Sequence, residues 1–157
     1  MIAVLAFPLG ALGWSLAEYL IHRFDGHGMR GRTPFSKEHL AHHRDPRTFA
    51  ATWKKVLVAV AVTALLFPLV SFVSGPVFAG GFTAGFVVMY ATYEIIHRRI
   101  HTHAPIGAYG RWARHHHLLH HHQDPAFNHG VTSPLWDIVF RTHLVRDVVE
   151  VPRRRAP

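Results

Sequence analysis

The sequence predicts an all-α integral membrane protein with about three transmembrane helices and with cytoplasmic helices that carry a histidine-rich site for two metal ions. Three observations lead to this fold class. Two long runs lack any charged residue, all lysines and arginines lie in two segments beside those runs, and all 16 histidines lie in the same two segments or directly before them. At 157 residues the chain has the usual length of one domain, and we expect residues 1–157 to form a single membrane domain.

The charge-free runs cover residues 1–17 and 56–93. A helix needs about 20 apolar residues to cross the hydrocarbon core of a bilayer. The first run therefore predicts one span that ends near Ile21, and the second predicts two spans that follow each other. Residues 74–76, which read Ser-Gly-Pro, are expected to form the turn between these two spans, because Gly and Pro together interrupt a helix.

The 17 Lys and Arg residues all lie within residues 23–55 and 98–155. Positive residues favour the cytoplasmic side of a membrane, so we expect both segments, the histidines and the C-terminus in the cytoplasm. No Lys or Arg precedes the first apolar run, which argues against a cleaved signal peptide. Beside three spans, the net charge of +8 indicates attraction to anionic headgroups rather than binding of nucleic acid. The chain has no cysteine, which excludes disulfides and cysteine-ligated metal sites.

Short helices are expected in the two polar segments, at residues 36–44, 110–122 and 135–148. Ser36 is a suitable N-cap for the first of them, and the Asp-Pro pairs at residues 45–46 and 124–125 are typical helix stops.

Ten of the histidines fall into four groups whose spacing suits metal binding. Residues 39–43 and 117–121 both read His-Leu-x-His-His, and positions i, i+3 and i+4 share one face of a helix, so the three imidazoles of each group point together. His97 and His101 form a convergent i, i+4 pair just beyond the third span. The repeated motif also indicates two similar halves of the chain that together build one site.

The remaining pair, His22 and His27, is five residues apart and would diverge on a continuous α-helix. We expect Asp25 and Gly26 to end the helix there and to turn the second imidazole back. Imidazole is a common neutral ligand for iron, zinc and copper. The expected ligands are His22, His27, His39, His42, His43, His97, His101, His117, His120 and His121.

The number of these histidines indicates two metal ions. A structural zinc ion takes four ligands, whereas ten imidazoles suit two ions with five each and leave coordination positions open for reactants. The other histidines are interpreted as capping or solvated residues, and contact with the ligands or the substrate stays open for some of them: His103, His115, His116, His122, His129 and His143.

Four acidic residues are candidates for orienting the ligands. Glu18, Glu38 and Glu94 lie near ligand histidines in the sequence, and Asp137 is a fourth candidate. Their carboxylates either accept the free ring N–H of a histidine and fix its tautomer, or form ordinary ion pairs, for example between Glu94 and Arg98.

The histidine pattern resembles the fatty acid hydroxylase / sterol desaturase superfamily of membrane di-iron oxygenases. The family pattern HxxxxH, HxxHH, HxxxH and HxxHH is matched in order by the four groups. The Glu-Tyr pair at residues 18–19 before His22 is also similar to the family, as are Gly-Val-Thr-Ser at 130–133, Trp-Asp at 136–137 and Val-Phe at 139–140.

The resemblance implies an O2-dependent oxidoreductase with two iron ions at the ten histidines, in which zinc can replace iron during purification. It implies C–H hydroxylation of a lipid such as a fatty acyl chain or a sterol; desaturation shares the hydrogen-abstraction step and stays open. Some members carry a fused cytochrome b5 domain, which this chain lacks. We therefore expect a separate electron donor, either a ferredoxin or a cytochrome b5-like protein with its reductase.

Two other functions stay open. Carotenoid hydroxylases of the same superfamily are similarly short, although their third motif is usually HxxxxH, whereas residues 97–101 here read HxxxH. A membrane protein that only binds or transports metal is the other alternative. Transport requires ionisable residues inside the membrane, and the charge-free runs at 1–17 and 56–93 argue against it.

Overall fold

The computed structural model describes residues 2–149, and within that range it contains helices and connecting loops but no strands. The last arginines of the second basic segment, at 153–155, lie outside the described residues. The elements are α1 (Ile2–Leu20), the π-helix η1 (Ile21–Gly28), α2 (Pro34–Arg44), α3 (Thr52–Ser74), α4 (Pro76–Thr102), α5 (Gly107–His122) and α6 (Leu135–Val139).

Three helical stretches are long and apolar enough to cross a membrane, which confirms the predicted number of spans. They are Val4–Gly28, Thr52–Ser74 and Pro76–Thr102. Gly75 joins the second and third at φ 81°, a conformation that favours glycine, so the turn also lies where the sequence predicts it. In α3 no residue is buried, and its outward apolar side chains suit contact with lipid.

Helices α1 and α4 cross at very short range because each places a glycine against the backbone of the other. A Cβ atom on Gly10 would lie 1.9 Å from the carbonyl oxygen of Phe82, and one on Gly85 would lie 2.0 Å from that of Phe7. Small residues allow such close backbone packing between membrane helices. The crossing packs α1 against α4, and η1, which continues α1, packs against α2.

The chain does not leave the helix at Asp25 and Gly26, contrary to the sequence-based expectation. It continues from α1 into η1, and the ring centroids of His22 and His27 lie 5.2 Å apart. A π-helix forms i→i+5 hydrogen bonds, so residues five apart become neighbours on one face. Widening of the helix, rather than its ending, therefore brings the second imidazole back.

Three other local expectations need correction. Helix α2 begins at Pro34, and its N-cap is Thr33, whose Oγ1 accepts a hydrogen bond from Ser36 N at 3.0 Å; Ser36 lies within the helix. Helix α5 begins at Gly107, three residues earlier than expected.

Helix α6 is much shorter than the expected 135–148, because it ends at Val139 and Arg141 adopts φ 57°. The chain then pairs with an earlier loop. Thr142 N donates to Asp137 O at 2.7 Å, and Asn128 N donates to Thr142 O at 2.8 Å. The first bond closes the end of α6, and the second is a tertiary contact with the loop at Asn128.

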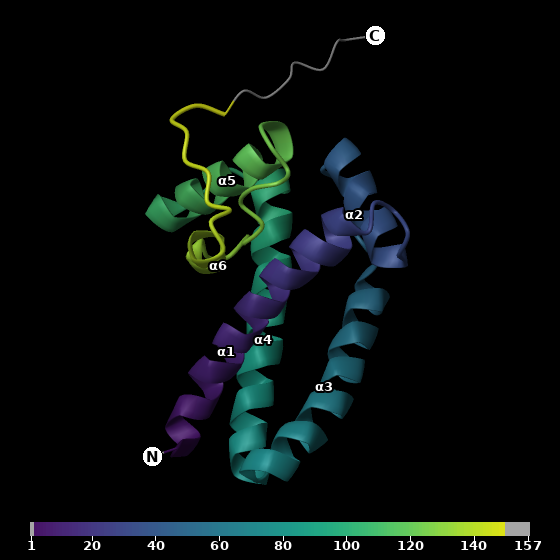
Figure 1. The fold of residues 1–157 in the computed structure, drawn as a ribbon, viewed down its shortest axis with the longest axis vertical. Coiled ribbons are helices and arrows are strands. Elements are labelled where there is room, and N and C mark those ends of the chain that lie inside the picture. The colour runs from purple at the N-terminus through teal and green to yellow at the C-terminus, as the bar shows by residue number, and fades with distance from the viewer. Residues whose placement is uncertain (1, 150–157) are drawn as a thin grey trace.

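The elements are arranged so that both histidine-bearing segments lie at the same end of the molecule. Figure 1 shows the N-terminus and the α3–α4 turn at one end, and α2, α5 and α6 at the other. Helix α4 is packed between α1 and α3, and its last turns rise into the layer formed by the shorter helices.

Candidate metal centre

The ten predicted histidines come together in two groups of five. In each group the nearest ring nitrogens of all five members lie within 4.8 Å of one another. The first group is His22, His27, His39, His43 and His120; the second is His42, His97, His101, His117 and His121.

Each half of the chain contributes four histidines to one group and one to the other. The crossing residues are His42 and His120, and each is the middle histidine of a His-Leu-x-His-His motif. Helix α2 thus directs His39 and His43 to the first group and His42 to the second, while α5 does the reverse. The two halves therefore interlock, and neither group can form from one half alone.

Backbone carbonyls determine the tautomers of three of these histidines. The Nδ1 atom of His42 lies 3.0 Å from Thr48 O, that of His120 lies 2.6 Å from Phe127 O, and that of His22 lies 2.5 Å from His129 O. A carbonyl oxygen only accepts, so each Nδ1 must carry the proton and donate it. In the neutral rings Nε2 then carries a lone pair, which is the form that binds metal.

The two crossing histidines obtain their carbonyl partners in the same way. Each motif is followed by an Asp-Pro pair, at 45–46 and 124–125, that turns the chain back. The carbonyl of Thr48 then meets His42, and that of Phe127 meets His120. The repeated sequence pattern therefore corresponds to a repeated structural device that orients one imidazole in each half.

The ring nitrogens inside each group fit a cation. His120 Nε2 lies 3.0 Å from His27 Nε2 and 3.1 Å from His43 Nε2, and His42 Nε2 lies 3.2 Å from His101 Nε2. The buried Nε2 atoms of His22 and His97 have no hydrogen-bond partner among residues 2–149. Lone pairs that converge in a buried space are unfavourable unless a positive charge lies between them, so the donor set suits one metal ion in each group.

Burial keeps these imidazoles neutral. Burial, together with the neighbouring histidines His27 and His42, lowers the pKa of His43 to about 3. Burial is also the largest cause of the lowered pKa of His39 and of His121. The second cause is the repulsion that a protonated ring would meet from other protonated imidazoles nearby. At neutral pH these rings are therefore unprotonated and available as ligands.

The structure places His117 rather than His116 in the cluster. His117 Nε2 lies 2.9 Å from His101 Nε2, whereas His116 Nε2 lies 3.3 Å from Asp137 Oδ2 and its ring stacks on Trp112. This arrangement agrees with the helical register expected from the sequence.

One histidine that the sequence interpretation set aside lies against the cluster. His129 is 2% exposed, and its ring centroid lies 5.5 Å from that of His120 and 5.6 Å from that of His22. Its carbonyl oxygen accepts the hydrogen bond from His22. The only signal in the sequence was its position directly before the Gly-Val-Thr-Ser motif.

The four acidic residues do not orient the ten histidines directly. Glu38 pairs with Lys54, and Glu94 pairs with Lys55 rather than with Arg98. Glu18 and Asp137 are buried and instead hold a loop. The Nδ1 atoms of His22, His42 and His120 have backbone carbonyls, and not carboxylates, as their hydrogen-bond partners.

The loop that Glu18 and Asp137 hold is the one that supplies two of those carbonyls. Glu18 accepts hydrogen bonds from Val131 N at 2.5 Å, Thr132 N at 3.1 Å and Thr132 Oγ1 at 2.9 Å. Asp137 accepts from the backbone N–H groups of His129 and Gly130, both at 2.8 Å. The carboxylates thus position the histidines through the loop.

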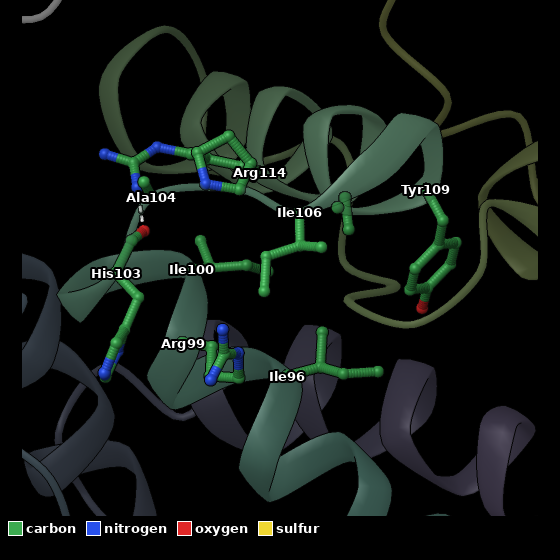
Figure 2. Close-up of a pocket in the computed structure, with 11 residues that line it drawn as sticks. Ile96, Arg99, Ile100, His103, Ala104, Ile106, Tyr109 and Arg114 are labelled. Carbon is green, nitrogen blue, oxygen red and sulfur yellow. Dashed lines mark hydrogen bonds between the residues drawn. The ribbon is translucent and has the colours of Figure 1, made fainter.

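Besides an open hollow beside His101, Thr102 and Arg114, two cavities lie near the C-terminal part of α4. One, of about 70 Å³, is lined by His39, His42 and His97 and also by Lys55 and Glu94, which pair with each other. The other, of about 150 Å³, lies between α4 and α5 and touches none of the ten histidines. In Figure 2, Ile96, Ile100 and Ile106 point into this second space, and Arg114 donates to His103 O at its edge.

Comparison with known proteins identifies relatives across most of this chain. The sequence model of the fatty acid hydroxylase family matches residues 7–142. Fatty acid 2-hydroxylase of Rattus norvegicus is 32% identical over 151 residues, covering 87% of this chain and 38% of the relative. Dihydroceramide fatty acyl 2-hydroxylase of Arabidopsis thaliana is 32% identical over 143 residues, covering 85% of this chain and 58% of the relative.

A solved structure has the same fold. The hydroxylase domain visible in full-length scs7p matches with a TM-score of 0.75 and 27% identity, over 96% of this chain and 59% of that chain. The chain therefore spans less than two thirds of the length of these relatives. The family match, the sequence relatives and the shared fold together establish that this chain belongs to the fatty acid hydroxylase family.

Proposed function

We propose that this protein is an integral membrane hydroxylase that uses O2 to oxidise a lipid acyl chain at a di-iron centre held by the ten histidines. The observation that carries the proposal is the convergence of ring nitrogens in two groups of five, within a chain of this family. The relatives are named as fatty acid and dihydroceramide fatty acyl 2-hydroxylases. We therefore propose the carbon next to the acyl carbonyl as the one that is hydroxylated.

The overall reaction replaces a C–H bond by C–OH. One oxygen atom of O2 enters the product, and the other leaves as water after uptake of two electrons and two protons. When bound, two iron ions supply the redox chemistry that activates O2. A ferredoxin, or a cytochrome b5-like protein with its reductase, is the proposed source of the electrons.

The residues of the chain hold and shield the centre. The carbonyls of Thr48, Phe127 and His129 fix three imidazoles in the metal-binding tautomer, and burial keeps the cluster away from bulk water. The apolar helices α1, α3 and α4 place this cluster where a lipid chain in the membrane can reach it.

The test measures metal and product together. The protein is purified from cells grown with added iron, and metals are counted per chain by elemental analysis. Turnover of a fatty acid and of an N-acyl sphinganine is then followed by mass spectrometry with O2 and an external reductant. We expect about two metals per chain and a product heavier by one oxygen atom. A product lighter by two hydrogens would indicate desaturation, and full activity with one metal would contradict the two-metal site.

A further inference from the structure

The smaller cavity beside the cluster has the features of the place where the substrate reacts. It is lined by His39 of the first group and by His42 and His97 of the second, so it reaches both groups at once. Its other walls include the rings of Phe35 and Phe49, which suit an apolar chain. At about 70 Å³ it holds a short stretch of a lipid, because sites that enclose whole ligands measure about 300 Å³ or more.

Lys55 is the one lysine or arginine among the residues that line this cavity. Its ammonium group pairs with the Glu94 carboxylate, and the two side chains are 19% and 23% exposed. The neighbouring pair, Lys54 with Glu38, is considerably more exposed, at 47% and 39%. Lys55 therefore presents a partly shielded positive charge beside the histidines, whereas Lys54 faces solvent.

Lys55 lies where the apolar parts of α3 and α4 end, which is the level of the lipid headgroups. In α3 the charge-free run begins at Val56, directly after Lys55, and in α4 it ends at Tyr93, directly before Glu94. The Lys55–Glu94 pair thus marks the level at which both helices pass from apolar to polar surroundings. A lipid whose chain lies along α3 and α4 has its polar end at this level, next to the histidines.

We propose that Lys55 is a positioning residue that donates a hydrogen bond to the acyl carbonyl oxygen of the substrate, so that the adjacent carbon faces the histidines and receives the hydroxyl group. The inference rests on the proposed function and deepens it. Hydroxylation at that carbon requires the polar end to be held within a bond or two of the reacting C–H group. A cation that lines the same small cavity as ligands of both groups meets this requirement.

Glu94 has the opposite role in this arrangement. Its carboxylate competes with the substrate oxygen for the Lys55 ammonium, so its removal frees the lysine. If the pair were only structural, loss of either partner would have a similar effect. The two partners therefore give the inference a direct test.

The experiment compares Lys55→Met, Lys55→Arg and Glu94→Gln with the wild-type protein. Controls are Lys54→Met, from the exposed pair, and Arg99→Met, which lines the larger cavity of Figure 2. Each protein is supplied with an N-acyl sphinganine and with the free fatty acid of the same chain length. Metal content, KM and the position of the hydroxyl group are measured.

For Lys55→Met we expect unchanged metal content, a rise in KM of about tenfold, and product hydroxylated further along the chain, because a hydrogen bond from a charged donor is lost. The rise should be larger for the free acid, whose carboxylate carries a full charge, than for the amide. Lys55→Arg should restore the 2-hydroxy product, and Glu94→Gln should keep it with an equal or lower KM. Both controls should behave as wild type.

Several results would overturn the inference. For Lys55→Met, these are an unchanged KM with an unchanged hydroxyl position, or a loss of metal. Equal effects of Lys55→Met and Glu94→Gln on KM and hydroxyl position would also contradict it, as would a shifted hydroxyl position in Arg99→Met. Absence of any hydroxylated product from the wild-type protein would contradict the proposed function itself, and the role of Lys55 with it.

Discussion

The imidazoles of His22 and His27 lie on one face of η1 with their ring centroids 5.2 Å apart, although five positions separate them in the sequence. An α-helix would turn them away from each other, whereas the i→i+5 hydrogen bonding of a π-helix aligns them. Both belong to the first group of five histidines. The π-helix therefore provides two candidate ligands from the continuous end of a membrane helix, without a loop.

Gly26 in the π-helix is expected to be essential for the first metal site. A Cβ atom at this position would lie 3.0 Å from Cδ2 of His39, so Gly26→Ala should shift the His39 imidazole by a few tenths of an ångström from its place in the group. We expect the variant to lose up to one of the two metals and most of its activity. The matched control is Gly28→Ala, whose Cβ would make an ordinary 3.5 Å contact with Arg23 O. Equal metal content in both variants would show that this packing is not needed.

His117→Ala and His116→Ala test which of two adjacent histidines binds metal. His117 lies among the ring nitrogens of the second group, so its loss should remove metal and abolish turnover. His116 contacts Asp137, and its loss should leave metal content unchanged, with a destabilisation of about 1–3 kcal/mol from the buried polar contact. Elemental analysis and thermal unfolding of both variants measure the difference. Loss of metal in His116→Ala but not in His117→Ala would show that His116, and not His117, is the ligand.

The close crossing of α1 and α4 predicts that its glycines tolerate no side chain. Gly10→Ala and Gly85→Ala would each place Cβ about 2 Å from a backbone carbonyl oxygen of the other helix. The helices must then separate, and we expect each variant to lose about 1–3 kcal/mol of stability or more. Gly80→Ala is the control, because nothing lies within 4 Å of its Cβ position. Thermal unfolding in detergent measures this, and three equal unfolding temperatures would refute it.

The charge distribution predicts that both histidine-bearing segments face the cytoplasm. The chain has no native cysteine, so single cysteines can be placed at the exposed positions Ala51, Ser74 and Ala108 and labelled with an impermeant reagent. We expect positions 51 and 108 to react from the cytoplasmic side and position 74 from the opposite side. Labelling of 51 and 108 from different sides would contradict the topology.

The spans and the ten clustered histidines could be predicted from the sequence because both depend on local properties. Hydropathy over about 20 residues is enough to recognise a membrane helix. The spacing i, i+3, i+4 is enough to place imidazoles on one helical face, as at residues 39–43 and 117–121. Neither inference requires knowledge of which segments meet in space.

Tertiary structure alone decided how the histidines are shared and oriented. His42 and His120 leave their own motif to join the opposite group, which depends on how α2 and α5 face each other across the end of α4. The carbonyl of His129 reaches His22 because Glu18, on a distant helix, binds the loop that follows His129. The same loop ends α6 early through Asn128 and Thr142. These contacts join residues far apart in the chain, and backbone carbonyls carry no side-chain signature, so no local pattern could indicate them.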